Sequence, residues 1–258
     1  MNSTLAPLFD FDTSLKKEAE HADKMYLLLL AEGLTDISRQ KSERKNGTDF
    51  LLQLEHGSVR LENKFEHYAS GRVTLELLSV DRPTMVPGWM WSSQAAWLFS
   101  WFLPSAELVV WPLDELRQVF FANPLRHKAT TAYNGNLKFG GKPYMTWSAL
   151  EDIGWLLPRV PGACHVDIQD ELGTPREKPR MLAQLNQQQV TAEELCRRLH
   201  AGPLQSTPRQ PPAPREFRAM LPLLWERNLR KREPVHQRSY RELVDSVESK
   251  KAGALLAA

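Results

Sequence analysis

The sequence predicts a layered α/β domain followed by a mainly helical C-terminal appendage. Apolar and polar residues alternate over residues 48–66 and again over 71–80, which is typical of antiparallel strands. The run AELVVWP (106–112) is continuously apolar, as expected of a strand that is covered on both faces. Segments with helical spacing flank these strands. The expected order is therefore helix, three-strand antiparallel meander, helix, buried strand, helix, an order that folds into layers.

The first helix is expected over residues 14–32, because Ser14 can cap its N-terminus and Gly33 can end it. A polar loop over 39–48 leads to a hairpin within 48–66. If His56–Gly57 form its two-residue turn, Asp49 lies directly opposite Lys64.

The third strand of the meander is expected over residues 71–80, where the apolar side chains alternate. Residues 92–104 are expected to form the second helix, since their apolar side chains recur at helical spacing. The buried strand 106–112 and a capped helix over 112–123 complete the expected core.

The character of the sequence changes after residue 160. We expect residues 1–160 to form the α/β domain and residues 161–258 to form a linker-rich basic tail, with a proline linker over 205–215. Short helices are predicted over 191–200, where Thr191 and Glu194 have capping-box spacing, and within 216–247.

Charge is unevenly distributed along the chain. Residues 1–160 contain 17 basic and 19 acidic side chains, whereas residues 161–258 contain 16 basic and 12 acidic ones. Basic side chains gathered in one region favour contact with nucleic acid. The same region has an apolar stripe within 216–247, which also fits docking to a protein partner, to a second copy of the chain or to its own domain.

Cysteine content and hydropathy predict a cytoplasmic protein without a membrane span. The two cysteines lack C-x-x-C spacing, which fits a reducing compartment. The N-terminus lacks the basic-then-apolar order of a signal peptide. The most apolar run, residues 95–103, is shorter than the roughly 20 residues that a membrane helix needs.

Charged side chains on the polar face of the hairpin form a candidate catalytic centre. With Asp49 opposite Lys64, their Cβ atoms would lie about 5 Å apart and Glu62 would sit on the adjacent diagonal at about 7 Å. Carboxylates and water are the ligands that Mg²⁺ prefers. We therefore expect Mg²⁺ or Mn²⁺ to be bound by Asp49, Glu62 and the backbone carbonyl of Asn63, with Lys64 stabilising charge on a phosphate.

Asp49, twelve intervening residues and then Glu62-Asn63-Lys64 resemble the D…E-x-K signature of the PD-(D/E)XK nuclease superfamily, which has the restriction-endonuclease-like fold. The resemblance covers about residues 12–125. Thr48 occupies a position where the signature often has proline. The segment after Gly71 is similar to small nuclease-like proteins of phages and other bacterial mobile elements. The resemblance implies a Mg²⁺-dependent nuclease, with Asp49, Glu62 and Lys64 as the catalytic residues.

Three further residues are candidates for an auxiliary role in this site. Glu76 is either a second-metal ligand or a solvent-facing carboxylate, and it shares the polar face only if the connection before it contains a bulge or an odd-length turn. Glu20 on the first helix and Gln94 on the second can approach the cleft, although an ordinary helix surface explains Glu20 and helix capping explains Gln94.

Basic residues in two segments are candidates for phosphate contacts. The first segment, 126–142, contains no acidic residue, so a phosphate-tracking loop and a solvated loop both fit it. The candidate nucleic-acid-binding residues are Arg126, Lys128, Lys138, Lys142, Arg227, Arg230, Lys231 and Arg232.

The function expected from these residues is metal-dependent endonucleolytic hydrolysis of phosphodiesters in DNA. The alternative is a non-catalytic nucleic-acid-binding accessory protein that has the nuclease-like fold and recruits a partner through its C-terminal tail.

Overall fold

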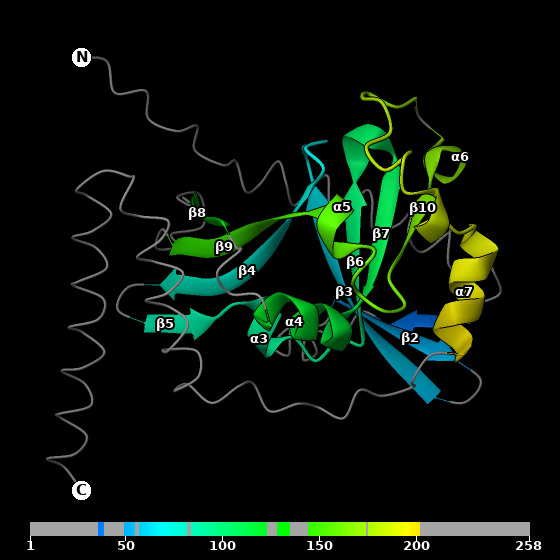
Figure 1. Cartoon of the computed structure of the whole chain (residues 1–258). Helices are drawn as coiled ribbons and strands as arrows, with labels where there is room; N and C mark the ends of the chain where they lie inside the picture. Colours follow the sequence, from blue (N-terminus) through cyan, green and yellow to red (C-terminus); the bar gives the residue numbers. More distant parts are fainter. Residues whose placement is uncertain are drawn as a thin grey trace, which may run out of the picture.

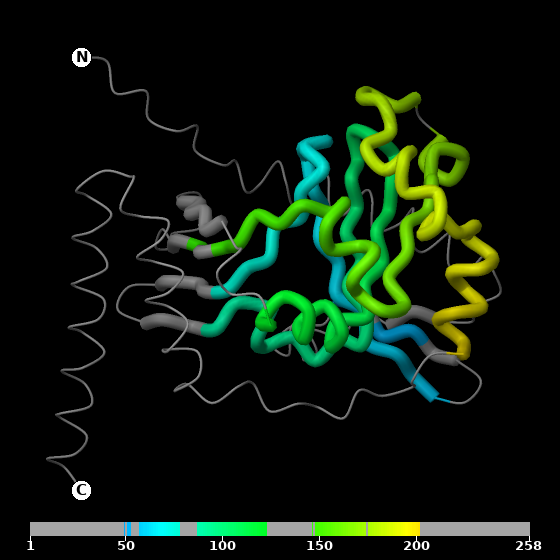
Figure 2. The backbone as a smooth tube through the Cα atoms, in the orientation of Figure 1, coloured from blue at the N-terminus to red at the C-terminus, as the bar shows by residue number. Residues whose placement is uncertain are grey.

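A computed structural model describes residues 36–38, 49–54, 57–81, 84–122, 128–134, 144–173 and 175–201, and these form a mixed α/β structure (Figure 1). Figure 2 draws the backbone as a smooth tube in the same orientation, with colours that follow the sequence. The predicted helices over 14–32 and within 216–247 and the proline linker over 205–215 lie outside the described residues.

The larger sheet has six strands in the described part of the chain. Their order is β1 (Asp36–Ser38), β2 (Phe50–Leu54), β3 (Gly57–Glu66), β6 (Trp97–Phe102), β7 (Glu107–Pro112) and β10 (Cys164–Asp167). Neighbouring strands are antiparallel except β3 and β6, which are parallel. The sheet therefore begins as an antiparallel meander, β1–β2–β3, and continues into β6, all six residues of which are buried.

A second, antiparallel sheet contains β5 (Thr84–Pro87), β4 (Arg72–Asp81), β9 (Tyr144–Asp152) and β8 (Lys128–Asn134), in that order. Short helices join and cover the two sheets: α3 (Trp89–Ser92), α4 (Leu113–Phe121), α5 (Ile153–Leu156), α6 (Gln169–Leu172) and α7 (Ala192–Ala201), with 3₁₀ turns at Leu103–Ser105 and Asn186–Gln188.

The six-stranded sheet is covered on both faces. On one face, Leu61 and Phe99 pack with Leu195 and Leu199 of α7. On the other face, side chains of β6 and β7 pack with the second sheet and with α4. Figure 1 shows α7 on one side of this sheet and the second sheet extending away on the other.

The predicted meander is wrong in its third strand. Residues 71–80 do not pair with β3; they form most of β4 in the second sheet, and the third strand of the meander is β1. After β3 the chain reverses direction at Gly71, whose φ of 68° suits a residue without a Cβ atom. The free edge of β3 is then taken by β6.

The helix predicted over residues 92–104 is also wrong, because Trp97–Phe102 is strand β6. Its sequence, WLFSWF, is rich in aromatic residues, which favour strands. A strand that is buried on both faces shows no apolar–polar alternation, so its apolar residues also fit a helical spacing.

Three other predicted elements are confirmed. The strand at 106–112 is β7, the helix at 112–123 is α4 and the helix at 191–200 is α7. Thr191 caps α7, since the backbone N–H of Glu194 donates to its Oγ at 3.1 Å.

The boundary predicted at residue 160 falls inside the packed fold. Strand β10 pairs with β7, and α7 contributes Leu195 and Leu199 to the core. Residues 164–201 therefore complete the α/β structure instead of forming a linker-rich tail. The physical reason is that β10 and α7 each present apolar side chains that only the six-stranded sheet buries.

Candidate functional site

The register of the hairpin places Asp49 beside Glu62. Phe50 pairs with Leu61 and Leu54 pairs with Gly57, so the register that would place Asp49 opposite Lys64 is wrong by two residues. Because side chains alternate with a period of two, this shift keeps the predicted face unchanged. The shift brings the two carboxylates closer together than predicted. Because Phe50 pairs with Leu61, the preceding residue, Asp49, lies beside Glu62.

Backbone contacts hold Asp49 against β3. The Asp49 N–H donates to the carbonyl of Leu61 at 2.9 Å, and the N–H of Asn63 donates to Asp49 Oδ2 at 2.8 Å. The Asp49 carboxylate is thus fixed by the strand that carries Glu62 and Lys64.

Glu62 and Lys64 form an ion pair on β3. They are two residues apart, so both project from the same face of the strand. Lys64 Nζ lies 2.5 Å from Glu62 Oε1, and the exposed fraction is 32% for the lysine side chain and 3% for the glutamate. The glutamate is therefore almost fully buried, whereas the lysine stays partly open to solvent.

Residues around α3 contact the Glu62–Lys64 pair from another side. Ser93 Oγ donates to Glu62 Oε2 at 3.5 Å, and the ammonium of Lys64 lies 5.7 Å from the centroid of the Trp89 ring. An ammonium near the face of a tryptophan ring is attracted by the ring quadrupole. The predicted Glu62–Lys64 pair is thus contacted by residues of a segment that the sequence indicates only as a connection broken by proline and glycine.

Glu76 reaches the site from the second sheet. The ladder between β4 and β9 is irregular between Glu76 and Leu78, so a bulge lies at this point of the strand. Gly88 packs against the bulge: its N–H donates to the carbonyl of Leu77 at 2.9 Å, and a Cβ atom at this position would lie 2.5 Å from the Glu76 carbonyl oxygen. The bulge expected before Glu76 therefore lies directly after it.

Burial and neighbouring charges shift the pKa values of three residues in this cluster. Burial raises the pKa of Glu62 to about 7, with Asp49 and Glu76 adding to the rise and Lys64 opposing it. Burial alone would lower the pKa of Lys64, but the carboxylates of Glu62, Asp49 and Glu76 raise it above its ordinary value. Burial also raises the pKa of Glu76, against the influence of Lys64.

The charges of this cluster suit a divalent cation. Three carboxylates, Asp49, Glu62 and Glu76, face one ammonium, Lys64, which leaves a formal excess of two negative charges when all are ionised. In the described residues, no group of three or more His, Cys, Asp or Glu side chains is arranged to hold a metal ion by itself. Mg²⁺ is often bound by one or two carboxylates together with waters and substrate phosphate, and Asp49 and Glu62 fit that requirement.

The neighbouring Asn63 contributes differently. Its side chain is 5% exposed, and its Oδ1 accepts a hydrogen bond from Trp101 Nε1 at 3.3 Å on the other face of the strand. Its side chain is therefore directed away from Glu62 and Lys64, and only its backbone carbonyl stays a candidate ligand.

Gln94 and Lys128 are the other predicted site residues that the structure describes, and the contacts described for this cluster involve neither of them. Gln94 is half-buried in the connection between α3 and β6, so the helix expected to carry it is absent there. Lys128 is the first residue of β8 and pairs with Leu150. The candidates outside the described residues are Glu20, Arg126, Lys138, Lys142, Arg227, Arg230, Lys231 and Arg232.

The sequence interpretation missed Gly88, Trp89 and Ser93. They lie more than twenty residues after Lys64, in a segment broken by proline and glycine. The only signal was local: the glycine precedes an aromatic-rich turn, WMWS, which is unusual in a solvated connection. No sequence pattern indicated which strand this turn would contact.

Comparisons with protein-family models, with curated proteins and with solved structures each found no match to this chain. Among the described helices, none combines the length and the apolar character required to cross a membrane.

Proposed function

We propose that this chain is a metal-dependent nuclease of the PD-(D/E)XK type that hydrolyses phosphodiesters in DNA. The observation that carries the proposal is the contact between Glu62 and Lys64 on one face of β3, with Asp49 held against the same strand. These are the three side-chain types, in the spacing, that the superfamily signature requires.

The order of strands supports the proposal. An antiparallel β1–β2–β3 meander lies in one sheet with the buried strands β6 and β7, and β7 is the buried strand expected over 106–112. The chain between β3 and β7 departs from expectation, because it consists of β4, β5, α3 and β6 instead of a third meander strand and one helix. This departure delivers Glu76, Trp89 and Ser93 to the acidic cluster.

Asp49 and Glu62 are the side chains that would hold Mg²⁺. When bound, the metal lowers the pKa of a coordinated water and offsets charge on the phosphate. The hydrogen bond from Asn63 N–H fixes the Asp49 carboxylate before substrate arrives, and Ser93 does the same for Glu62. Such preorganisation avoids reorientation during the reaction.

Lys64 has two roles in this proposal. Its ammonium balances part of the negative charge of the cluster, and its partial exposure lets it approach a phosphate oxygen from the solvent side. Because nearby carboxylates raise its pKa, Lys64 is protonated at neutral pH and acts as a charge stabiliser, not as a base. The water that attacks phosphorus therefore gives its proton to an acceptor other than Lys64. As the P–O ester bond breaks, the leaving oxygen takes up a proton from solvent, so hydrolysis yields an alcohol and a phosphate monoester.

The proposal is tested by incubating purified protein with supercoiled, linear, single-stranded and branched DNA in Mg²⁺, Mn²⁺ or EDTA. Cleavage with either metal and none in EDTA supports it. The variant Glu62→Gln should lose cleavage because a neutral amide binds a divalent cation poorly.

Glu66→Gln is the matched control for this variant. Glu66 lies on the same face of the same strand, but its carboxylate accepts hydrogen bonds from the N–H and Oγ of Thr74, at 2.9 and 3.2 Å, which attach β4 to β3. This variant should retain cleavage. Binding of DNA without cleavage of any substrate would reject the nuclease and favour the accessory protein instead.

A further inference from the structure

Arg117 on α4 binds the α3 turn through several backbone carbonyls. Its Nε donates to the carbonyl of Met90 at 2.8 Å, and its Nη2 donates to the carbonyls of Ser93 at 2.6 Å and Trp89 at 3.5 Å. Asp114, one turn earlier on α4, accepts from Arg117 Nη1 at 3.1 Å and so orients the guanidinium.

The α3 turn depends on such outside support. It has only four residues, and a helix of one turn is not stable without tertiary contacts. The last carbonyls of a helix also lack partners within that helix. The guanidinium supplies donors in a fixed fork, which the compact ammonium of a lysine does not reproduce.

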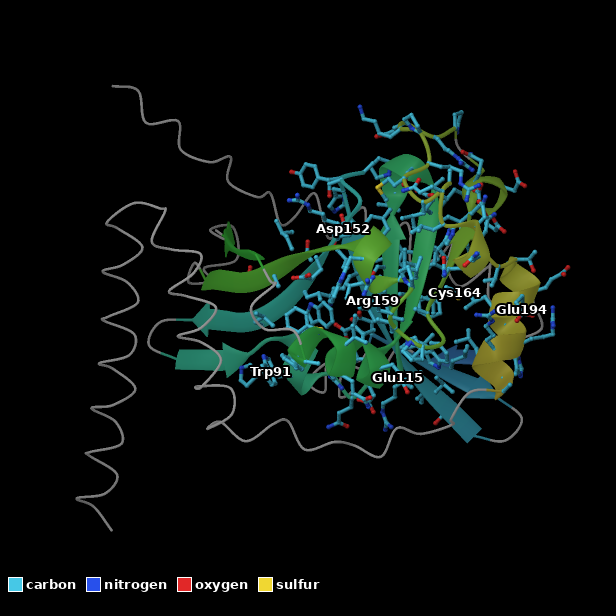
Figure 3. All side chains as sticks on the ribbon, viewed as in Figure 1. Trp91, Glu115, Asp152, Arg159, Cys164 and Glu194 are labelled. Carbon is cyan, nitrogen blue, oxygen red and sulfur yellow. The ribbon has the colours of Figure 1, made fainter. Side chains whose placement is uncertain are left out.

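Packing adds to this support. The rings of Trp91 on α3 and Phe121 on α4 lie with their centroids 4.1 Å apart. Figure 3 labels Trp91 where α3 adjoins α4. The α3 turn is thus held between α4 and the acidic cluster.

The opposite side of the turn contacts that cluster. Gly88 precedes α3 and packs on the backbone of Glu76, Trp89 lies beside the ammonium of Lys64, and Ser93 follows α3 and donates to Glu62. A displacement of α3 would therefore alter the surroundings of all three charged residues at once.

We propose that Arg117 is a positioning residue of the site: by fixing the carbonyls of Trp89, Met90 and Ser93, it holds α3 so that Trp89 and Ser93 keep Lys64 and Glu62 in contact. This inference rests on the proposed function, in which these two residues are catalytic. Arg117 acts on the site through α3, to whose backbone carbonyls it donates while Asp114 orients its guanidinium.

The test compares Arg117→Ala and Arg117→Lys with the matched control Arg159→Ala. Arg159, labelled in Figure 3, follows α5 and also donates to a helix carbonyl, that of Trp155 at 2.8 Å, with its guanidinium over the Trp155 ring. The contacts described for the acidic cluster do not involve α5. All proteins are first shown to be folded by denaturant titration. Hydrogen exchange is then measured at the α3 amides, and NMR records the shift of the Lys64 ε-methylene protons, which the Trp89 ring current displaces.

We expect Arg117→Ala to speed exchange at the amides of Trp91, Ser92 and Ser93 by about 10- to 100-fold, because bonds to a charged donor are removed. The Lys64 shift should move toward the value of an ordinary lysine. Mn²⁺ affinity should fall about 10-fold, the usual effect of removing a residue that supports a metal ligand. Arg117→Lys should fall between wild type and Arg117→Ala, and Arg159→Ala should match wild type in all three measurements.

The Arg117 proposal and the proposed function fail in different ways. An Arg117→Ala protein with wild-type exchange in α3 and an unchanged Lys64 shift would overturn the positioning role. Faster exchange without a change at Lys64 would also overturn it, because α3 would then be held without consequence for the site. If wild-type protein neither binds Mn²⁺ nor cleaves DNA, the proposed function fails, while the exchange rates and the Lys64 shift still decide the role of Arg117.

Discussion

Replacing Glu62 with glutamine should make the fold more stable at alkaline pH. Burial and neighbouring carboxylates raise the pKa of Glu62 from 4.5 to about 7. Between these two values the folded protein keeps a proton that the unfolded chain has released, so ionisation of Glu62 lowers stability as pH rises. Below the pKa of the unfolded chain, the carboxyl is protonated in both states, so this group does not change the free energy of unfolding with pH.

The size of the effect follows from the shift. At about 1.4 kcal/mol per pKa unit, the penalty between pH 5 and pH 8 amounts to about 2–3 kcal/mol. Glutamine has a similar shape and carries no charge. In EDTA, the free energy of unfolding of Glu62→Gln relative to wild type should therefore increase by about this amount from pH 5 to pH 8.

The assay is urea denaturation at several pH values, followed by tryptophan fluorescence, with and without Mn²⁺. Saturating Mn²⁺ should stabilise wild type at pH 8 by about 3 kcal/mol at 100 times its Kd, and it should leave Glu62→Gln nearly unchanged. Glu66→Gln is again the control. Burial raises the pKa of Glu66 as well, so this variant should show a pH trend of the same sign, but it should keep the stabilisation by Mn²⁺.

A constant stability difference between Glu62→Gln and wild type from pH 5 to pH 8 would refute the reasoning. It would mean that the Glu62 carboxylate is solvated or fully balanced in the folded protein. Equal stabilisation of both proteins by Mn²⁺ would separately refute its role as a ligand.

The site and the packing around it predict three further outcomes. Lys64→Ala should reduce the cleavage rate, measured by single-turnover kinetics, by about 10²–10³-fold, and it should leave the fold, measured by circular dichroism, intact. A variant as active as wild type would remove Lys64 from the mechanism. Gly88→Ala should lower the free energy of unfolding by about 1–3 kcal/mol, because its Cβ would lie 2.5 Å from the Glu76 carbonyl oxygen. Gly173→Ala, at a position with φ of 64° and open space around it, should lower the free energy of unfolding by about 1 kcal/mol. Equal destabilisation of the two variants in denaturant titration would contradict this prediction. A fragment ending at residue 160 lacks β10 and α7 and should not show a cooperative unfolding transition, whereas a fragment ending at 204 should keep one. The salt slope of DNA binding of the 1–204 fragment should be smaller by about 0.9 for every phosphate that the removed residues neutralise in the full chain. Cooperative unfolding of the 1–160 fragment would reinstate the domain boundary at 160.

The sequence determined the local features of this protein. Period-two alternation over 48–66 predicted the hairpin, and its polar face predicted that Asp49, Glu62 and Lys64 lie close together. The three residues share a face despite the two-residue error in register, because side-chain direction repeats every two residues. The N-cap at Thr191 and the continuous apolar run of β7 were predicted correctly because hydrogen bonding and burial there depend on adjacent residues.

Only the tertiary structure decided which elements meet. Nothing in residues 71–80 indicates whether they extend the first sheet or begin a second one, because an amphipathic strand fits either position. The choice depends on β6, which occupies the edge of β3. The helix predicted at 92–104 failed for a different reason, because burial on both faces removes the alternation that identifies a strand. The supports of the site, Gly88, Trp89, Ser93 and Arg117, are separated from Lys64 by 24 to 53 positions in the sequence. Their contacts with the acidic cluster and with α3 arise from packing between layers, which no local spacing encodes.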